Sequence, residues 1–471
     1  MYILDEKSKT PLHIQLDEKS KTPLHIQLYE AIKDDILFHH KVGDKLPSIR
    51  KVATLYNLSK TTVESAYSQL YAEGYIESRP KSGYYVCELY LDTFKNSHVP
   101  KAKTPPKKSS YCYDFFPARL HSEDFPLKLW KRLYTKVITD TVDFGAYPDG
   151  QGEAILREEI SSYLQDSRGV RCDADQIIIT HGFSDSMELL AKLIRKRYSH
   201  FAQEIPGYHI AHKVFDAYDY HTHPIPVDED GLDIEALIQS QAQVVYITPT
   251  HQYPTGATMP ISKRLKLIQH MQSIGGLIIE DDYDSELSYY NRPIPSLQGL
   301  DSGENVVYLG TFAKALSPTI RVGYMVVPTW IRTLFKESYD AHFARVNLTT
   351  QLTLAHFMKE GHWQKHINRV RILNKKKHQA MKEALQKYLG NTFDIVAQGA
   401  GLSILIVSKD AEFDYQKLKT LAEEKQIAIY LAKERSGGDF EAVRMGFGGF
   451  RLDEIEGAVE SFSEVWREVI K

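Results

Sequence analysis

Residues 306–324 read VVYLGTFAKALSPTIRVGY, and apolar runs like those of this stretch recur between residues 177 and 327. An apolar run, Val306–Leu309, is followed by a segment rich in Gly, Thr and Ser that carries Lys314, and a second apolar run begins at Val322. Similar runs lie at residues 177–179, 244–247 and 277–279, and most are separated by segments of helix length. Fully apolar strands that alternate with helices indicate a parallel sheet that helices cover on both faces. We therefore expect an α/β domain over residues 111–333, followed at residues 334–471 by a smaller α+β subdomain.

Polar residues stand directly after several of these runs, at the sheet edge where open α/β sheets bind their ligands. Asp281 closes the run at 277–279, and Tyr283 follows two residues later. Residues 180–184, THGFS, lie between a strand and a helix, and backbone N–H groups at a helix start can hold a phosphate. Together with Lys314, these residues form a candidate ligand site.

The candidate site contains what pyridoxal phosphate requires of a protein: a lysine for the Schiff base, an acid for the pyridine nitrogen, a hydroxyl donor and an anion site. Thr311 and Arg321 add a hydroxyl and a charge near Lys314. Simpler interpretations exist. A lone lysine in a loop is usually solvated, and the pair Asp281-Asp282 can also suggest a metal site. No histidine or cysteine has ligand spacing to that pair, so we expect no metal.

Three motifs in this part of the chain carry a family resemblance. TPTHQYPTG at 248–256, EDDYDSE at 280–286 and GTFAKALSPTIRVGY at 310–324 resemble signatures of the MocR/GabR family. In that family a GntR-type DNA-binding head is fused to a domain with the fold of fold-type-I aminotransferases. The resemblance implies this fold for the region beyond Tyr111 and pyridoxal 5'-phosphate as its cofactor.

The resemblance also implies roles for individual residues. Lys314 would form the Schiff base, Asp281 would pair with the pyridine nitrogen, and Tyr283 would lie near the ring hydroxyl. Tyr208 would stack on the ring, and Tyr147 would reach the phosphate in the other subunit of a homodimer. The residues implied to hold the phosphate are Phe183, Ser184, Thr311 and Arg321.

The chain departs from the pattern of the families that it resembles at several positions. Tyr253 stands where aminotransferases place an asparagine before Pro-Thr-Gly, next to the cofactor ring, and the bulky Phe183 stands where a small residue is usual. His209 and Ile210 follow Tyr208 where GabR has arginines, which argues against γ-aminobutyrate as the effector.

An arginine near the C-terminus is the candidate for effector binding. Arg444, in VRMGFG at 443–448, matches the arginine with which aminotransferases bind the substrate carboxylate, and Arg435 is a second candidate. The alternative for Arg444 is a surface arginine on an edge strand.

The N-terminal region predicts three helices and a hairpin. Leu24, Leu28, Ile32 and Ile36 recur every four residues after Pro23 and lie on one helical face. Ser48 and Ser59 can cap two further helices, each with an apolar stripe of helical spacing. Strand-like runs at 75–77 and 84–86 flank the tip Arg79-Pro80-Lys81. This order describes a winged helix-turn-helix over residues 23–91.

The outward face of the third helix has the composition of a recognition helix. It begins at the cap Ser59 and presents Lys60, Thr61 and Thr62, which are short polar and basic side chains that suit the major groove. Basic side chains that can hold DNA phosphates are Arg50 and Lys51 on the second helix and Arg79 and Lys81 on the wing. The alternative is the solvated face that any small helical domain has.

Three N-terminal segments resemble the DNA-binding domain of GntR-type regulators: PLHIQLYEAI at 23–32, GDKLPSIRKVA at 43–53 and LSKTTVESAYSQLYAEGYIESRPKSGYYV at 58–86. The resemblance implies DNA-contacting or wing-shaping roles for Arg50, Lys60, Thr62 and Gly83. Arginine is common at the position of Lys60. Because lysine lacks the bidentate fork, base reading there should be weaker.

Two segments flank this domain. Residues 4–15 and 16–27 both read LDEKSKTPLHIQ, and we interpret residues 1–22 as a duplication artefact. Residues 92–110 form a linker, which from Phe94 onward carries five lysines and no acidic residue. Its Pro105-Pro106 favours an extended chain, and its lysines either solvate a tether or touch DNA phosphates.

Composition limits the classes of protein. No apolar run is long enough for a membrane span, and no secretory signal opens the chain. Cys87, Cys112 and Cys172 form neither a disulfide framework nor a metal spacing, which fits the cytoplasm. The net charge of -3 neither supports nor excludes nucleic acid as a partner.

These features predict a homodimeric transcription regulator that binds double-stranded operator DNA. It would sense an amino compound through external aldimine formation, or sense pyridoxal phosphate itself. The alternative is an active aminotransferase with a DNA-binding appendage, and a third interpretation is a cofactor-storage protein. Because Tyr253 replaces the asparagine that tunes the ring in aminotransferases, we expect at most weak transamination.

Overall fold

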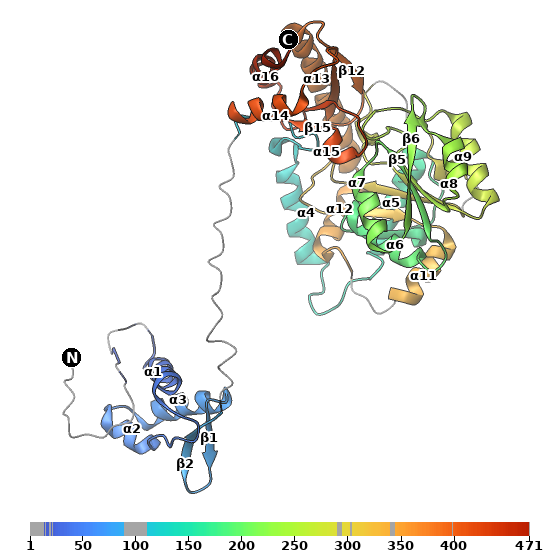
Figure 1. Cartoon of the computed structure of the whole chain (residues 1–471). Coiled ribbons are helices and arrows are strands. Elements are labelled where there is room, and N and C mark those ends of the chain that lie inside the picture. Colours follow the sequence, from blue (N-terminus) through green and yellow to red (C-terminus); the bar gives the residue numbers. More distant parts are fainter. Residues whose placement is uncertain are drawn as a thin grey trace. The chain divides into compact units, whose positions relative to one another are not determined.

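A computed structural model of the chain describes residues 22–88, 111–289, 294–301, 304–339, 344–397 and 399–470, together with Ile14, Leu16, Asp17 and Ser20. Contacts divide the chain into two units, residues 1–108 and 109–471 (Figure 1). The predicted linker at 92–110 lies outside the described residues, as does nearly all of the first copy of the repeat.

The first unit is the predicted winged helix-turn-helix. Its elements are α1 (Leu24–His39), α2 (Ile49–Leu55), α3 (Lys60–Ala72), β1 (Ile76–Arg79) and β2 (Gly83–Val86). Both predicted caps are present, because Ser48 accepts the Lys51 N–H at 3.3 Å and Ser59 accepts the Thr62 N–H at 3.1 Å. Strands β1 and β2 form an antiparallel wing. The apolar core contains Leu28, Ile32, Val63 and Leu70.

The described residues of the repeat contact this core. Ile14 and Leu16 pack against it, and Asp17 and Gln27 exchange two hydrogen bonds between backbone and amide side chain. Removal of residues 4–15 would place Tyr2 two positions before Leu16, the place that Ile14 now occupies. An apolar contact at this position therefore needs only one copy of the repeat, and the artefact interpretation stays a prediction.

The second unit is built on an eight-stranded sheet of order β4-β11-β10-β9-β8-β5-β6-β7. The strands are β4 (Ile177–Thr180), β5 (His200–Ile205), β6 (His221–Asp228), β7 (Gly231–Leu232), β8 (Val244–Ile247), β9 (Leu277–Asp281), β10 (Val306–Thr311) and β11 (Gly323–Val326). The helices around it are α4 (Leu127–Asp140), α5 (Ala154–Arg168), α6 (Phe183–Ile194), α7 (His209–Ala217), α8 (Ile234–Ser240), α9 (Ile261–Ser273), α10 (Leu297–Leu300), α11 (Thr329–Tyr339) and α12 (Leu348–Lys359).

Helices cover both faces of this sheet, as predicted. Helices α6, α7 and α11 pack on one face, and α5, α8, α9 and α12 pack on the other (Figure 1). Because both faces are covered, alternate side chains of a strand such as β9 enter different apolar clusters: Ile279 joins one and Ile278 the other. The continuous apolar runs of the sequence arise from this double burial.

One strand of the main run, β11, departs from the parallel sheet that the apolar runs indicate. Strand β11 runs antiparallel to both neighbours, β10 and β4. A parallel return would require a crossover of a dozen or more residues, usually with a helix. The chain instead turns back through the short loop 312–322, which carries Lys314, so the two strands run in opposite directions.

Strands β5 and β6 were not predicted, because their sequences, HFAQEI and HTHPIPVD, lack an apolar run. Pro224 and Pro226 in β6 are tolerated because this strand pairs along most of its length with β5 alone.

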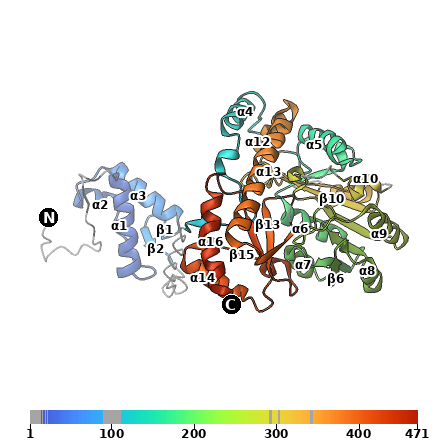
Figure 2. The same ribbon diagram turned by 90° about the horizontal axis from the view of Figure 1, so that it is seen from above.

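A smaller antiparallel sheet lies near the C-terminus, with the order β12-β13-β16-β15. Its elements and neighbours are α13 (His362–Leu389), β12 (Phe393–Ala397), β13 (Ser403–Ser408), α14 (Tyr415–Glu424), β14 (Ile427–Ala428), β15 (Tyr430–Leu431), α15 (Lys433–Ser436), β16 (Val443–Gly446) and α16 (Ile455–Val469). Helices α13, α14 and α16 pack on it (Figure 2). The short strand β3 (Tyr113–Asp114) pairs with β14, so the start of the second unit joins this C-terminal core. The subdomain boundary at residue 333 stays a prediction.

Among the helices of the described segments, none combines the length and the apolar character that crossing a membrane requires.

Candidate functional site

The carboxyl end of β9 carries the central acid of the site. Asp281 is 7% exposed and accepts a hydrogen bond of 2.7 Å from the Tyr246 hydroxyl on the neighbouring strand β8. Burial raises the pKa of the Asp281 carboxyl to about 7, while the Tyr246 hydrogen bond acts in the opposite direction. A buried carboxylate of this kind can bind a cationic ring nitrogen, because the positive charge offsets the cost of burying the negative one.

The two acids beside Asp281 stabilise the fold. Glu280 accepts the backbone N–H groups of Leu297 and Gln298, at 2.9 and 3.0 Å. Asp282 binds the Arg168 guanidinium at 2.6 Å and the Tyr308 hydroxyl at 2.5 Å. Successive side chains of a strand point to opposite faces, so Asp281 alone of the three faces Tyr246.

Lys314 lies in the loop that joins β10 to β11. Its side chain is half-buried, and its Nζ lies 6.0 Å from the centroid of the Tyr283 ring. The loop is anchored by its neighbours, because Ala315 and Leu316 are buried in the core and the Ala315 carbonyl contacts the His366 ring at 2.8 Å. Lys314, from a different loop, thus lies with Asp281 and Tyr283 around one end of the central strands.

The start of α6 forms a candidate phosphate cradle. Gly182 precedes the helix with a φ of 105°, a conformation that favours glycine, and a Cβ there would come within 3.4 Å of the Arg321 guanidinium. The first N–H groups of α6, from Phe183 and Ser184, have no carbonyl partner within the helix. Arg321 has a φ of 50°, which is uncommon outside glycine and typical of functional sites. Thr311 ends strand β10 beside this cradle.

Aromatic rings line the space between the cradle and Asp281. Tyr208 lies edge-on to Phe183, with ring centroids 5.1 Å apart, and edge-on to Tyr253 at 5.4 Å. Phe183 also contacts Tyr246 at 5.7 Å. The bulk of Phe183, unusual at its position, is therefore accommodated against two tyrosines. Tyr208 is half-buried and in place to stack on a ring bound at Asp281.

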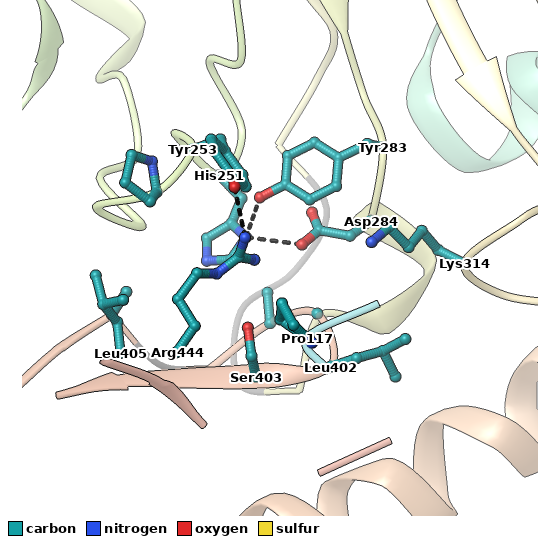
Figure 3. A pocket seen from close by; sticks show the side chains of 14 residues that line it. Pro117, His251, Tyr253, Tyr283, Asp284, Lys314, Leu402, Ser403, Leu405 and Arg444 are labelled. Carbon is teal, nitrogen blue, oxygen red and sulfur yellow. Dashed lines mark hydrogen bonds and ion pairs between the residues drawn. The ribbon is translucent and has the colours of Figure 1, made fainter. Parts of the chain in front are cut away.

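A pocket opens beside Lys314, between the ends of the eight-stranded sheet and the smaller sheet (Figure 3). Its space, including the open mouth, is about 420 Å³. The lining residues are Pro117, His251, Tyr253, Pro254, Tyr283, Asp284, Lys314, Ala397, Ala400, Gly401, Leu402, Ser403, Leu405 and Arg444. Arg444 reaches the pocket from β16 and donates from Nη1 to the Tyr253 hydroxyl at 2.5 Å.

Three polar residues of the site were missed by sequence reasoning. His251 Nδ1 lies 2.8 Å from an Asp284 oxygen and 3.2 Å from the Tyr283 hydroxyl. Burial alone would lower the pKa of His251, but the Asp284 carboxylate outweighs it and raises that pKa. Both residues stand inside motifs that were quoted for the family resemblance, so they could have been found there. The sequence indicates Tyr246 only weakly, because the one clue is a hydroxyl group within an otherwise apolar strand.

One predicted site residue, Tyr147, is not brought into this cluster. Tyr147 is 79% exposed, in the segment between α4 and α5, and its predicted contact with a second subunit stays a prediction. Arg435 belongs to α15, but its side chain lies outside the described residues. Among the side chains that the structure describes, no group of three His, Cys, Asp or Glu is arranged to hold a metal ion.

The first unit presents the predicted DNA-contacting residues on its surface. Lys60 and Thr61 are exposed at the start of α3, and Lys60 lies 3.2 Å from Glu64 one turn later. The Ser59 hydroxyl contacts those of Thr61 and Thr62 at 2.8 and 2.7 Å, so Ser59 serves as the helix cap. Exposed residues on α2 are Arg50 and Lys51.

The wing holds its basic residues in an ordered arrangement. The Arg79 guanidinium lies 4.2 Å from the centroid of the Tyr85 ring and binds Glu77 at 2.7 Å. Lys81 at the exposed tip has a φ of 61°, and Gly83 has a φ of 117° at the tight turn. Lys45, which sequence reasoning did not single out, adds a third cation, 5.7 Å from the Tyr85 ring.

The residues of the second unit fit pyridoxal phosphate. Asp281 is a buried acid, which suits a cationic ring nitrogen, and Gly182 at the start of α6 lies beside the Arg321 guanidinium, which suits a phosphate. Lys314 lies near the Tyr283 ring. This placement suits a lysine that forms the Schiff base while the tyrosine hydroxyl contacts the hydroxyl of the cofactor ring. These individual roles stay predictions, but each is chemically compatible with its surroundings.

Known proteins resemble both units. Residues 119–448 match the model of aminotransferase class I and II, and residues 24–86 match that of the bacterial regulatory proteins, gntR family. The chain is 36% identical to the uncharacterized HTH-type transcriptional regulator YdeL of Bacillus subtilis (strain 168), over 90% of this chain and 92% of that protein. It is 32% identical to the probable rhizopine catabolism regulatory protein MocR of Rhizobium meliloti, over 86% and 83%.

Among solved structures, the kynurenine aminotransferase of Pyrococcus horikoshii, in complex with PMP, is similar to the second unit. The TM-score is 0.68 and the sequence identity 25%, over 77% of this chain and 92% of that one.

Proposed function

Because the chain belongs to the MocR/GabR family of gntR-type transcription regulators, we propose that the pocket at Lys314 senses an amino compound and thereby changes operator binding. The chain is an HTH-type regulator that binds DNA through its gntR-type domain, and its aminotransferase-like domain uses pyridoxal 5'-phosphate. What remains to be assigned is the signal that it detects.

The observation that carries the proposal is that one chain contains both a helix-turn-helix with an exposed start of α3 and a candidate cofactor site. Lys60 and Thr61 stand at the open start of α3, and Lys314 and Asp281 stand at the candidate ligand site. An enzyme has no use for a DNA-binding domain, and an inert scaffold has no use for a cofactor site. A ligand-controlled regulator uses both.

When bound, pyridoxal phosphate supplies an aldehyde that combines reversibly with primary amines. The protein's own residues would position it. Asp281 would keep the ring nitrogen protonated, and the N–H groups at the start of α6 with Arg321 would neutralise the phosphate. Lys314 would hold the cofactor until an amine replaces it. Arg444 would bind the carboxylate of that amine.

The residue at position 253 favours sensing over turnover. Transamination requires the released lysine to move a proton at the α-carbon, with the reacting bond held in a defined orientation. Tyr253 stands at the asparagine position of aminotransferases, and its hydroxyl is bonded to Arg444. The Tyr253 hydroxyl therefore contacts the opposite wall of the pocket. Because Tyr253 replaces the asparagine that tunes the cofactor ring in aminotransferases, the amine would be bound without efficient conversion. Active transamination is therefore not our preferred function.

We also propose that the regulator acts as a homodimer. Two large aromatic side chains between α4 and α5, Phe144 and Tyr147, are 78% and 79% exposed, as an interface that completes a neighbouring site would require. Two recognition helices would then read two half-sites of the operator. An energy difference of about 1–3 kcal/mol between the two arrangements of the dimer would be enough to alter DNA affinity.

The test is a titration of the purified full-length protein, loaded with cofactor, against a panel of amino acids and dipeptides. Cofactor absorbance, operator affinity and keto-acid formation are measured in the same samples. We expect one class of amine to change the absorbance and the operator affinity together, with less than a few turnovers.

Two results would contradict this function. Sustained keto-acid formation at the ~10 per second typical of enzymes would identify an active aminotransferase. A change of operator affinity on addition of pyridoxal phosphate, with no absorbance response to any amine, would identify a sensor of the cofactor itself.

A further inference from the structure

Two side chains beside Tyr283 have no role in the function proposed above. His251 lies in the loop after β8, and Asp284 follows Tyr283 in the loop after β9 (Figure 3). We propose that His251 and Asp284 are positioning residues that direct the hydroxyl proton of Tyr283 toward the ring oxygen of the bound cofactor. The inference rests on the cofactor site of the proposed function and does not depend on which effector the pocket binds.

A single nitrogen of the His251 ring serves two neighbours. Its Nδ1 lies 2.8 Å from Oδ2 of Asp284 and 3.2 Å from the Tyr283 hydroxyl, and Figure 3 shows both contacts. A ring nitrogen either carries a proton and donates, or has a lone pair and accepts. The position of one proton therefore decides whether Tyr283 donates to His251 or accepts from it.

Two observations place that proton on Nδ1. A carboxylate can only accept, so the contact of 2.8 Å with Asp284 is a hydrogen bond only if Nδ1 carries the proton. The other ring nitrogen is a poor alternative, because Nε2 of His251 is buried and has no hydrogen-bond partner among the described residues. A proton there would be a buried donor without an acceptor, which costs free energy.

The charge state of the ring does not alter this arrangement. Burial lowers the pKa of His251, but the Asp284 carboxylate outweighs burial and raises that pKa. The cationic ring carries a proton on both nitrogens, and the neutral ring carries its one proton on Nδ1. In both states, His251 therefore donates from Nδ1.

Tyr283 then keeps its own proton for another acceptor. Burial and the Asp284 carboxylate raise the pKa of the Tyr283 hydroxyl well above its ordinary value of 10, so the group remains protonated. A hydroxyl has only one proton to donate. Because His251 does not accept it, this proton is available to an oxygen on the side of the pocket where Lys314 Nζ lies 6.0 Å from the Tyr283 ring centroid.

The surrounding chain holds the three groups closely. Asp284 is 3% exposed, and a Cβ on Gly401 would come within 2.7 Å of its Oδ2. Gly401 has a φ of 70°, so both its conformation and its lack of a side chain leave the carboxylate in place. The rings of His251 and Tyr283 lie nearly parallel, with centroids 6.2 Å apart.

Other charged or titratable groups act on the same side chains. Arg444 opposes Asp284, since its charge lowers the pKa of His251 and that of the Tyr283 hydroxyl. Tyr253 and Asp281 raise the pKa of the Tyr283 hydroxyl. The variants proposed for the test leave Arg444, Tyr253 and Asp281 unchanged, so their contribution stays constant.

The experiment measures how pH divides the bound cofactor between two absorbance forms, with and without a proton on the nitrogen that joins it to Lys314. A hydrogen bond to the ring oxygen stabilises negative charge there and so favours the form without the proton. Loss of this hydrogen bond should therefore raise the pH midpoint. The full-length, cofactor-loaded protein is titrated without any amine, over the pH range in which it stays folded.

The variants separate positioning from structural support. Asp284→Ala and His251→Leu each remove one member of the pair, whereas His251→Asn keeps an N–H group near the place of Nδ1. Tyr283→Phe, alone and combined with Asp284→Ala, shows whether the effect passes through the tyrosine hydroxyl. The matched control is Asp301→Ala, because Asp301 is also 3% exposed and accepts from Gln272 at 2.6 Å, outside the pocket.

We expect Tyr283→Phe to raise the midpoint by about one pH unit or more, the effect of losing a hydrogen bond to a charged group. Asp284→Ala and His251→Leu should raise it in the same direction and by a similar amount. His251→Asn and Asp301→Ala should keep the wild-type midpoint. In the Tyr283→Phe protein, Asp284→Ala should cause no further shift.

The inference is overturned if Asp284→Ala lowers the midpoint, because the carboxylate would then act through its negative charge alone, or if it leaves the midpoint unchanged. It is also overturned if Asp284→Ala shifts the midpoint further in Tyr283→Phe, or if His251→Asn behaves like His251→Leu. A wild type whose absorbance does not respond to pH would contradict the role of Tyr283 on which the inference depends. Because no amine is present, these results are separate from the amine titration that tests the sensing function.

Discussion

Replacement of Asp281 by asparagine should stabilise the protein without cofactor and weaken its response to cofactor. The Asp281 carboxyl is 7% exposed, and burial raises its pKa to about 7 from an ordinary 3.8. The folded state therefore binds this proton more tightly than the unfolded state does. Stability declines as pH rises from about 4 to 7, and the full cost of the buried charge is present above pH 7.

The magnitude follows from the difference between the two pKa values. About three pH units at 1.36 kcal/mol each amount to about 4 kcal/mol, as an order of magnitude for the alkaline limit. Asparagine removes the charge and keeps an oxygen that can accept the Tyr246 hydroxyl. Asp281→Asn should therefore exceed the wild type in free energy of unfolding at pH 8.5, and the gap should close near pH 4.

The assay is urea unfolding of the full-length, cofactor-free protein at pH 5 and pH 8.5, followed by tryptophan fluorescence. All four tryptophans lie beyond residue 111, so the signal reports the second unit alone. Addition of pyridoxal phosphate should reverse the order of stability at pH 8.5, because a cationic ring nitrogen compensates the wild-type carboxylate and finds no partner in the variant.

The neighbouring acid, Asp282, gives a control for which the opposite change in the free energy of unfolding is expected. Asp282→Asn breaks a buried ion pair with Arg168, so it should destabilise the protein by about 3–5 kcal/mol. A cofactor-free Asp281→Asn protein that is less stable than the wild type at pH 8.5 would refute the burial argument.

Three further outcomes are expected. Lys314→Ala should abolish fixation of the cofactor by borohydride, and persistent fixation would mean that another lysine is the anchor. Lys60→Ala should reduce discrimination among DNA sequences, whereas Lys81→Ala should weaken all sequences about equally, with a salt slope of about -0.9 per neutralised phosphate in filter-binding or anisotropy titrations. Equal losses of sequence discrimination in both variants would contradict the assignment of base reading to Lys60 and of phosphate contact to Lys81. Deletion of residues 4–15 should leave operator affinity and cofactor binding unchanged, because Tyr2 then takes the place of an apolar contact; a large loss in either titration would give the repeat a role.

Local features of both units could be predicted because their causes are local. The caps Ser48 and Ser59 need only a hydroxyl three residues before an N–H group, and both hydrogen bonds are present. The continuous apolar runs became strands of a doubly covered sheet, since burial on both faces leaves no polar alternation. The cofactor and the family likewise follow from short motifs whose residues are adjacent in the chain.

The path of the chain between distant segments could not be read in this way. The apolar runs indicate a parallel sheet in general but do not give the direction of each strand, and β11 runs antiparallel to β10. Strands β5 and β6 depend on pairing with neighbouring strands, β5 with both β6 and β8, because their apolar residues are interrupted by polar residues or proline.

The sequence by itself therefore determined the two domain types, the cofactor and the apolar strands of the main sheet. Only the tertiary structure decided which polar groups meet: Asp281 with Tyr246, and Tyr253 with Arg444, which lie 35 and 191 positions apart in the chain. The physical reason is that a cap or a buried strand is specified by residues next to one another, whereas a contact across a pocket depends on where folding has brought two segments. One chain read alone contains no record of such pairs.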